Sequence, residues 1–146
     1  MATLLVGSSL LPSIQHEISR LTPQKIYIVG GTGVVPSEIE STLKSLFGDE
    51  AVVRISGPNR YETAVSLSEA VFTDAGAVDV VFLATGSNSP DALGAAWAAG
   101  HLGVPVLLVG STLPGVVATE IARLDPDPVY VVGGSGVVPD AVLTAL

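Results

Sequence analysis

The sequence predicts an α/β fold in which three layers, helix, sheet and helix, enclose a mostly parallel sheet of about six strand–helix units. Short apolar runs rich in Val, Ile and Leu alternate with segments of helical periodicity. Runs without polar alternation are typical of parallel strands that are buried on both faces. In addition, a long segment of the chain occurs twice, which indicates a fold built from repeats.

The repeat becomes visible when the sequence is shifted by 103 positions. This shift aligns Leu4–Leu43 with Leu107–Leu146, with about half of the positions identical, and the motifs LLVGS, EIxRL and VGGxGVVP recur in order. The chain therefore contains one and a half copies of a module of roughly 100 residues. We expect one compact α/β unit over residues 1–146, with 1–50 as the trailing half of one repeat and 51–146 as a complete repeat.

Six apolar runs of strand length are expected to form the sheet. They are Leu4–Gly7, Ile26–Gly30, Val52–Ile55, Val78–Thr85, Val106–Gly110 and Val129–Gly133. Apolar stripes at helical spacing lie between them. The stripes are Ile14, Ile18 and Leu21; Ile39, Leu43 and Leu46; and Tyr61, Ala64, Val65, Ser68, Val71 and Phe72.

Helix starts carry their own signals. The signals are capping-box pairs at Ser37 with Glu40 and at Asn59 with Glu62, and the sequence Ser89-Pro90-Asp91 with a cap, a proline and an acid in order. The segment Asp91–Gly100 is nearly all Ala, Gly, Leu and Trp97. With so little polar surface, it is expected to be a buried helix.

Composition excludes several classes of partner. The net charge is -8, with 14 Asp and Glu against 6 Lys and Arg, which disfavours nucleic acid and anionic membranes. The chain has no cysteine, so disulfides and thiolate metal sites are excluded. The apolar runs are far shorter than the ~20 residues of a membrane span, and the N-terminal residues show no secretion signal.

Ligands of open parallel sheets bind outside the carboxyl ends of the strands, where four loops are expected here. The loops are Gly30–Gly33, Ser56–Tyr61, Gly86–Ser89 and Gly133–Gly136. Polar and aromatic residues gather most densely in Arg54–Ala64, RISGPNRYETA. The candidate binding residues are Arg54, Arg60, Tyr61, Thr63, Asn88 and Asp91.

Arg60 is unusual because it falls in the first turn of a predicted helix, where the helix dipole disfavours a cation. Asp91, at another helix start behind a parallel strand, is a plausible partner. Two interpretations stay open: an internal Arg60–Asp91 ion pair that fixes two loops, or a contact of Arg60 with a ligand or a neighbouring module.

The catalytic signatures are poor. GGTG lacks the third glycine of a dinucleotide loop, which is Pro36 here, and favours tight turns with glycine at positive φ. Ser87 lies in no nucleophile elbow, and Asp125 and Asp127 flank prolines as in a turn. His16 and His101 are isolated, and no metal-ligand cluster is apparent. We therefore expect no catalytic residue, cofactor or metal.

Several ordered motifs resemble one family. RISGPNRYETA, VFLATGSNSPDALGAA, PVLLVG and VYVVGGSGVVPD together look like the cell wall binding repeat 2 family of Gram-positive surface proteins. The likeness spans Val53–Leu146 as a whole repeat and Leu4–Leu43 as the trailing half of another. It implies a Rossmann-like or Toprim-like module, noncatalytic and extracellular, that packs with further copies and anchors an exported protein at the cell wall.

The resemblance implies noncovalent binding to an anionic cell wall polysaccharide or teichoic-acid-like polymer. The acidic balance of the chain fits such a ligand poorly unless Arg54 and Arg60 create a local positive potential or cations form bridges. A neutral glycan or another protein as the ligand is the other possibility. A structural or assembly repeat that mediates contacts between modules, including homo-oligomers, is the alternative. A nucleotide-dependent enzyme is a third.

Overall fold

The computed structural model describes residues 2–74, 76 and 78–146. The chain divides into two compact units, Met1–Ser56 (unit 1) and Gly57–Leu146 (unit 2). The boundary falls inside the RISGPNRYETA stretch, after its strand and before its helix. The assignment of residues 1–50 and 51–146 to a half repeat and a whole repeat within one compact unit stays a prediction.

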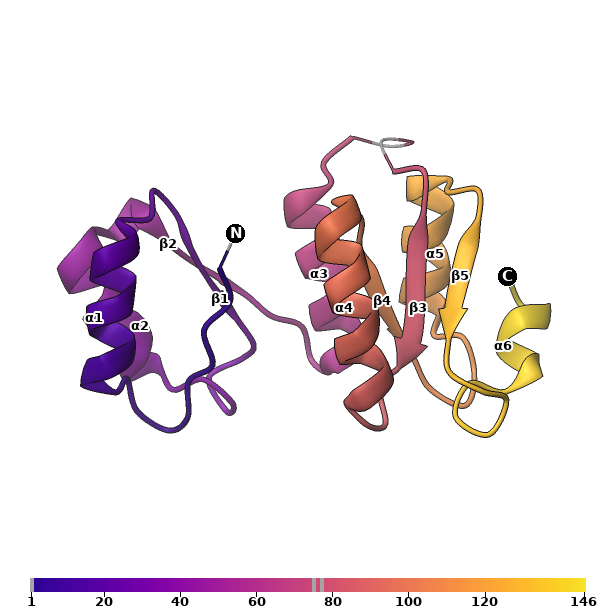
Figure 1. Cartoon of the computed structure of the whole chain (residues 1–146), viewed down its shortest axis with the longest axis horizontal. Coiled ribbons are helices and arrows are strands. Elements are labelled where there is room, and N and C mark those ends of the chain that lie inside the picture. The colour runs from indigo at the N-terminus through magenta and orange to yellow at the C-terminus, as the bar shows by residue number, and fades with distance from the viewer. Residues whose placement is uncertain (1, 75, 77) are drawn as a thin grey trace. The chain divides into compact units, whose positions relative to one another are not determined.

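Unit 1 is a small α/β unit with a two-stranded parallel sheet (Figure 1). Its elements are α1 (Pro12–Leu21), β1 (Ile26–Val29), α2 (Ser37–Phe47), a short 3-10 helix η1 (Asp49–Ala51) and β2 (Val52–Ile55). Ile26 of β1 lies opposite Val52 of β2 in the ladder. Side chains from both helices and both strands meet in one buried cluster. Its members are Ile18, Ile28, Ile39, Leu43 and Val52.

The predicted strand Leu4–Gly7 is wrong. These residues join no ladder in the described part of the chain, although Leu4 and Val6 pack against the core of unit 1. Their repeat counterparts lie at Leu107–Gly110, mostly within strand β4 (Val106–Val109), which pairs with β3 (Val81–Thr85). The shift of 103 positions places no residue of unit 1 over β3. Within the described residues, no strand therefore pairs with Leu4–Gly7 in the way that β3 pairs with β4.

Unit 2 holds a three-stranded parallel sheet in the order β4-β3-β5 (Figure 1). Its elements are α3 (Arg60–Val71), β3, α4 (Pro90–Leu102), β4, α5 (Gly115–Leu124), β5 (Val129–Val132) and α6 (Asp140–Thr144). The chain steps from β3 to β4 and then back across the sheet to β5. The right-handed rule for parallel crossovers predicts α4 and α5 on opposite faces of such a sheet. Accordingly, α4 packs on all three strands, whereas α5 packs beside α3. The three-layer α/β prediction is confirmed, with five strands rather than six in the part of the chain that the structure describes.

Of the two predicted capping boxes, one is confirmed as a helix cap and the other is wrong. Asn59 caps α3, because its Oδ1 accepts hydrogen bonds from the amides of Tyr61 at 2.9 Å and Glu62 at 3.1 Å. The box at Ser37 is wrong: α2 begins at Ser37 itself, after Pro36 in an extended conformation, and Ser37 makes no capping hydrogen bond. A serine inside the helix no longer has the extended backbone that directs a cap side chain to the first turn.

Helix α4 is not buried as predicted. Ala95 and Ala99 pack inward, while Leu93, Leu102 and Trp97, the last 79% exposed, lie on the surface. The alanine stripe allows close approach to the sheet, and the helical period turns the large side chains of the same segment outward.

A polar cluster between α3 and α5 was not anticipated. The Glu120 carboxylate accepts hydrogen bonds from Ser68 Oγ at 2.5 Å and from Nε and Nη2 of Arg123 at 2.7 Å. The Glu120 side chain is 1% exposed and that of Arg123 27%. The pair with Glu120 raises the pKa of Arg123 further above its ordinary value, so the guanidinium stays charged.

The same pair recurs in unit 1, one repeat earlier. Glu17 and Arg20 also lie 2.7 Å apart, but there the side chains are 36% and 62% exposed. In unit 2, α3 covers the equivalent pair and supplies Ser68. One sequence motif, EIxRL, thus gives a surface ion pair in one unit and a buried cluster in the other.

Candidate functional site

The stretch from Gly57 to Thr63 is a rigid entry to α3. Thr63 Oγ1 accepts a hydrogen bond from the Gly57 amide at 3.0 Å and donates one to the Asn59 carbonyl at 2.9 Å. A Cβ atom added at Gly57 would lie 2.5 Å from Cβ of Glu62, so only glycine fits there. Thr63 therefore holds the turn together from within.

Tyr61 packs against the carboxyl ends of two strands. An added Cβ at Gly86, after β3, would lie 2.8 Å from Tyr61 Cε1, and one at Gly110, after β4, would lie 3.2 Å from Tyr61 Oη. The two glycines leave the space that the half-buried ring occupies. Tyr61 thereby locates the start of α3 over the sheet edge where a ligand is expected.

Arg60 crosses to the same edge and donates a hydrogen bond from Nη1 to the carbonyl of Gly86. This carbonyl supplies the compensation that a cation in the first helical turn requires. The predicted Arg60–Asp91 ion pair is wrong: within the described residues no salt bridge joins them. Asp91 lies instead beside Gly133, where an added Cβ would come within 3.2 Å of its Oδ2.

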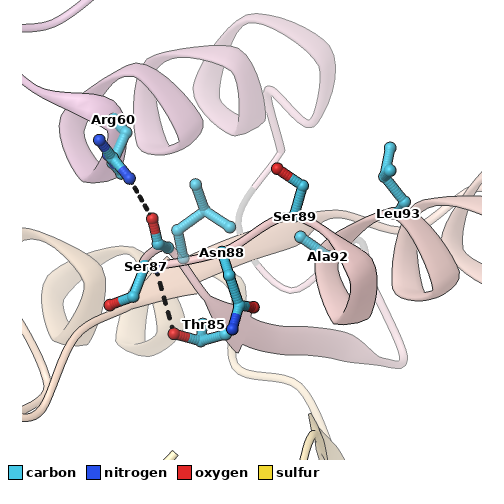
Figure 2. A pocket seen from close by; sticks show the side chains of 9 residues that line it. Arg60, Thr85, Ser87, Asn88, Ser89, Ala92 and Leu93 are labelled. Atoms are coloured by element: carbon cyan, nitrogen blue, oxygen red, sulfur yellow. Dashed lines mark hydrogen bonds between the residues drawn. The ribbon is translucent and has the colours of Figure 1, made fainter. Parts of the chain in front are cut away.

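An open hollow of about 380 Å³ lies next to Arg60, and we call it the Arg60 hollow. Figure 2 shows the guanidinium above the loop that follows β3. The lining residues are Arg60, Thr85, Gly86, Ser87, Asn88, Ser89, Ala92, Leu93 and Leu108. The loop is shaped by a hydrogen bond from the Ser87 amide to Thr85 Oγ1 at 3.2 Å. Hydroxyl, amide and guanidinium groups beside Leu93 suit a polar ligand with some apolar surface.

Arg54 belongs to unit 1. Its Nε donates to Glu40 Oε2 at 2.7 Å and its Nη1 to the Gly30 carbonyl at 2.7 Å. Hydrogen bonds from Lys44 and then Arg54 hold the pKa of Glu40 below its ordinary value. The guanidinium of Arg54 is thus bound within unit 1, and the Arg60 hollow is made by residues of unit 2 alone.

Of the predicted binding residues, Arg60 and Asn88 line the hollow together with the loop Gly86–Ser89. Tyr61, Thr63 and Asp91 lie outside the lining, and the sequence did not single out Thr85, Ala92, Leu93 and Leu108, which complete it. These four belong to two strands and a helix, where nothing in the sequence marks them as binding residues. The glycine turns are as expected, with Gly30 at φ +123 and Gly133 at φ +126.

Other site types find little support in the described residues. Across residues 2–74, 76 and 78–146, no group of three or more His, Cys, Asp or Glu could hold a metal ion. In the same described part, no helix is long and apolar enough to cross a membrane. His101 stacks on Trp97 at the surface of α4, with ring centroids 6.1 Å apart.

The parallel sheets, the internal repeat and the polar hollow at the strand ends define a repeat-built α/β module. Residues 54–143 match the family described as Cell wall binding domain 2 (CWB2), and the chain belongs to this family.

Two curated relatives come from Bacillus subtilis (strain 168). The chain is 35% identical to the Amidase enhancer over 139 residues, which is 92% of this chain and 17% of that protein. It is 28% identical to N-acetylmuramoyl-L-alanine amidase LytC over 131 residues, 89% of this chain and 25% of the amidase. The chain thus spans a quarter or less of these relatives.

Two solved structures share the fold. Cwp8 from Clostridium difficile superposes with a TM-score of 0.79 and 29% identity, over 94% of this chain and 23% of that one. Cwp6 from the same organism gives a TM-score of 0.80 at 24% identity, over 92% and 21% of the two chains. The α/β architecture of this chain is therefore shared with Cwp8 and Cwp6.

Proposed function

We propose that this chain is a noncatalytic module that anchors an exported protein to the cell wall by noncovalent binding of a wall polymer. The observation that carries the proposal is the family match over residues 54–143, a range that includes every residue lining the Arg60 hollow. The polymer is a cell wall polysaccharide or a teichoic-acid-like chain, and the hollow is the proposed contact site.

Arg60 and Asn88 are the proposed direct contacts. Both are exposed. A guanidinium carries five N–H donors and recognises phosphate or carboxylate groups in a bidentate manner, and one donor of Arg60 already binds Gly86. Tyr61 and Thr63 act by positioning Arg60, since their own polar and ring atoms are held within the turn and the sheet edge.

Arg54 and Asp91 receive supporting roles in this proposal. Arg54 orders the end of unit 1 through its bonds to Glu40 and the Gly30 carbonyl. Asp91 lies against the Gly133 turn at the start of α4, which carries two residues of the hollow. Neither side chain lines the hollow, so replacing either is expected to weaken binding less than replacing Arg60.

The chain has a net charge of -8, so whether its polymer is anionic or neutral is an open choice that the salt dependence of binding can test. An anionic polymer held by Arg60 gives retention that falls as salt screens the charge, over a Debye length of ~10 Å at 0.1 M. A neutral glycan held through hydroxyl and amide groups gives retention that salt hardly changes. The salt dependence therefore separates the two ligand classes at one site.

Sedimentation with purified Gram-positive cell walls is the direct experiment. We expect the chain to sediment with walls that carry their secondary polymer and to stay in solution with walls stripped of it. Arg60→Ala should reduce retention, whereas Arg20→Ala removes the same charge from an exposed ion pair in unit 1 and should not. Equal retention of Arg60→Ala and the unchanged chain would remove Arg60 from the site.

The absence of catalysis is part of the proposal. The relatives include an amidase, but the chain covers 25% of its length, so its activity is not carried over to this module. We expect the chain to release no soluble wall fragments during prolonged incubation with purified walls. Release that persists after Arg60→Ala, Asn88→Ala and removal of contaminating enzymes would contradict a purely binding role.

An assembly module is the second candidate, favoured by the surface of α4. Leu93, Trp97 and Leu102 are exposed on one helix, and Trp97 stacks on His101. Exposed apolar side chains of this size are typical of contacts between proteins. If assembly is the function, light scattering should show oligomers that Trp97→Ser dissociates, and the chain should stay in solution with every type of wall.

A further inference from the structure

Strand β5 is an edge strand of unit 2, since the sheet order is β4-β3-β5. The Gly86 amide at the end of β3 bonds to Val109 of β4, so alternate residues such as Leu83 face β5 instead. Leu83 lies opposite Val131, and in a parallel ladder a residue bonds to the two neighbours of its partner. Val131 and Gly133 therefore direct their amides away from the sheet.

Unit 1 shows what occupies the equivalent edge one repeat earlier. The counterpart of β5 is β1, and the counterpart of Gly133 is Gly30, with φ values of +126 and +123. The Gly30 amide donates to the Ile55 carbonyl of β2 at 2.8 Å. Within the described residues, the Gly133 amide donates no backbone hydrogen bond outside the sheet ladder. Among the residues that the structure describes, no strand pairs with this edge of β5 in the way that β2 pairs with β1.

A hollow of about 310 Å³ lies beside the open edge. Its lining includes Ile121, Val129 and Leu146, whose counterparts in unit 1 are Ile18, Ile26 and Leu43. In unit 1, Ile18 and Leu43 belong to the same buried cluster as Val52, the first residue of β2, and Ile26 packs against that cluster. Leu43 is 3% exposed there, whereas Leu146 is 50% exposed. The hollow in unit 2 therefore has the position and the lining of the site that Val52 fills in unit 1.

We propose that the outer edge of β5 and this hollow bind the leading strand of another copy of the repeat, a segment of the type Val52–Ile55, in parallel alignment. The β1–β2 register predicts Val52 of that copy opposite Val129 and Ile55 opposite Val132. Main-chain hydrogen bonds supply affinity, and the Val52 side chain entering the hollow fixes the register.

The arginine of the incoming strand has a different environment in unit 2. In unit 1, Arg54 binds the Glu40 carboxylate and the Gly30 carbonyl. Leu143 stands at the position of Glu40, so only the Gly133 carbonyl is available. Recognition at β5 therefore rests on the backbone and on Val52.

A chain extended past Leu146 by a second copy of Lys44–Pro58 tests the proposal, because this addition continues the repeat in register. The matched control carries the same extension with Val53→Pro and Ile55→Pro in the added copy, which removes the amides that face β5. Both versions lengthen α6 equally, so their difference isolates strand pairing.

Hydrogen exchange of the Val131 and Gly133 amides is the measurement, with the Leu107 amide in β4 as the reference. We expect exchange at Val131 and Gly133 to slow by roughly tenfold or more in the extended chain relative to the proline control. Equal rates in the two would overturn the proposal. The inference does not depend on wall binding, so this experiment and the sedimentation experiment can fail separately.

Discussion

Replacing Glu120 by alanine is expected to destabilise unit 2 by about 3 kcal/mol. The carboxylate accepts three hydrogen bonds, one from Ser68 and two from Arg123. Its loss leaves the buried Ser68 hydroxyl without that acceptor, at a cost of ~1–3 kcal/mol. The Arg123 side chain is 27% exposed, so it recovers part of its hydration, and it keeps its hydrogen bond to the Phe72 carbonyl. Both effects limit the contribution of Arg123 to the destabilisation.

Glu17→Ala is the matched control, because it removes the same residue from the same EIxRL motif and from an ion pair of the same length. The Glu17 side chain is half-buried and that of Arg20 exposed, at 36% and 62%, so water replaces the lost contact and the stability of unit 1 should hardly change. Urea unfolding followed by NMR reports the units separately through the amides of Leu83 in unit 2 and Ile28 in unit 1.

The expected result is a clear fall in the urea midpoint at Leu83 for Glu120→Ala and an almost unchanged midpoint at Ile28 for Glu17→Ala. Equal shifts for the two variants would refute the reasoning, since burial is the difference on which it rests. A Glu120→Gln variant should fall between, because the amide oxygen can still accept a hydrogen bond from Ser68.

Three further perturbations follow from local geometry. Gly86→Ala places Cβ 2.8 Å from Tyr61 Cε1 and should cost ~1–3 kcal/mol in thermal melts, whereas Gly115→Ala points into open space and should cost less. Asn59→Ala removes the cap of α3 and should cost about 1 kcal/mol in urea unfolding; an unchanged midpoint would contradict the capping role. Because cations hold the folded pKa of Glu40 below its ordinary value, its carboxylate stabilises unit 1 above the unfolded pKa, and this stability is lost as pH falls through the folded pKa. Glu40→Gln should therefore be less stable than the unchanged chain near neutral pH and equally stable in acid, and a gap that persists in acid would contradict this.

Local sequence signals were sufficient for most elements. Parallel strands buried between helices consist of continuous apolar runs. The strands β1 to β5 coincide with such runs, so each could be recognised from its own residues. The cap at Asn59 could also be predicted from the sequence, because capping involves groups only two or three residues apart. The family likeness rested on the same local motifs and is confirmed by the match over residues 54–143.

Local sequence signals could not predict which distant segments of the chain pair with one another. Leu4–Gly7 has the composition of a strand, but a ladder needs a neighbouring strand, and within the described residues none pairs with this segment. Because Arg60 and Asp91 both lie at helix starts, the sequence suggests an ion pair between them, whereas the folded chain brings the Arg60 guanidinium to the Gly86 carbonyl. The loop conformation after β3 decides that contact, and the side-chain types do not encode it.

The sequence by itself determined an α/β repeat module and the glycine turns at the strand ends, and it named candidate binding residues that stay a prediction. Only the tertiary structure decided which copy of a repeated motif is buried and which strand edge is paired. EIxRL is a buried cluster under α3 in unit 2 and a surface pair in unit 1, and β1 has a strand on the edge that β5 leaves open. The physical reason is that two copies of one motif have the same local propensities, whereas their burial and edge pairing depend on which other segments pack against them.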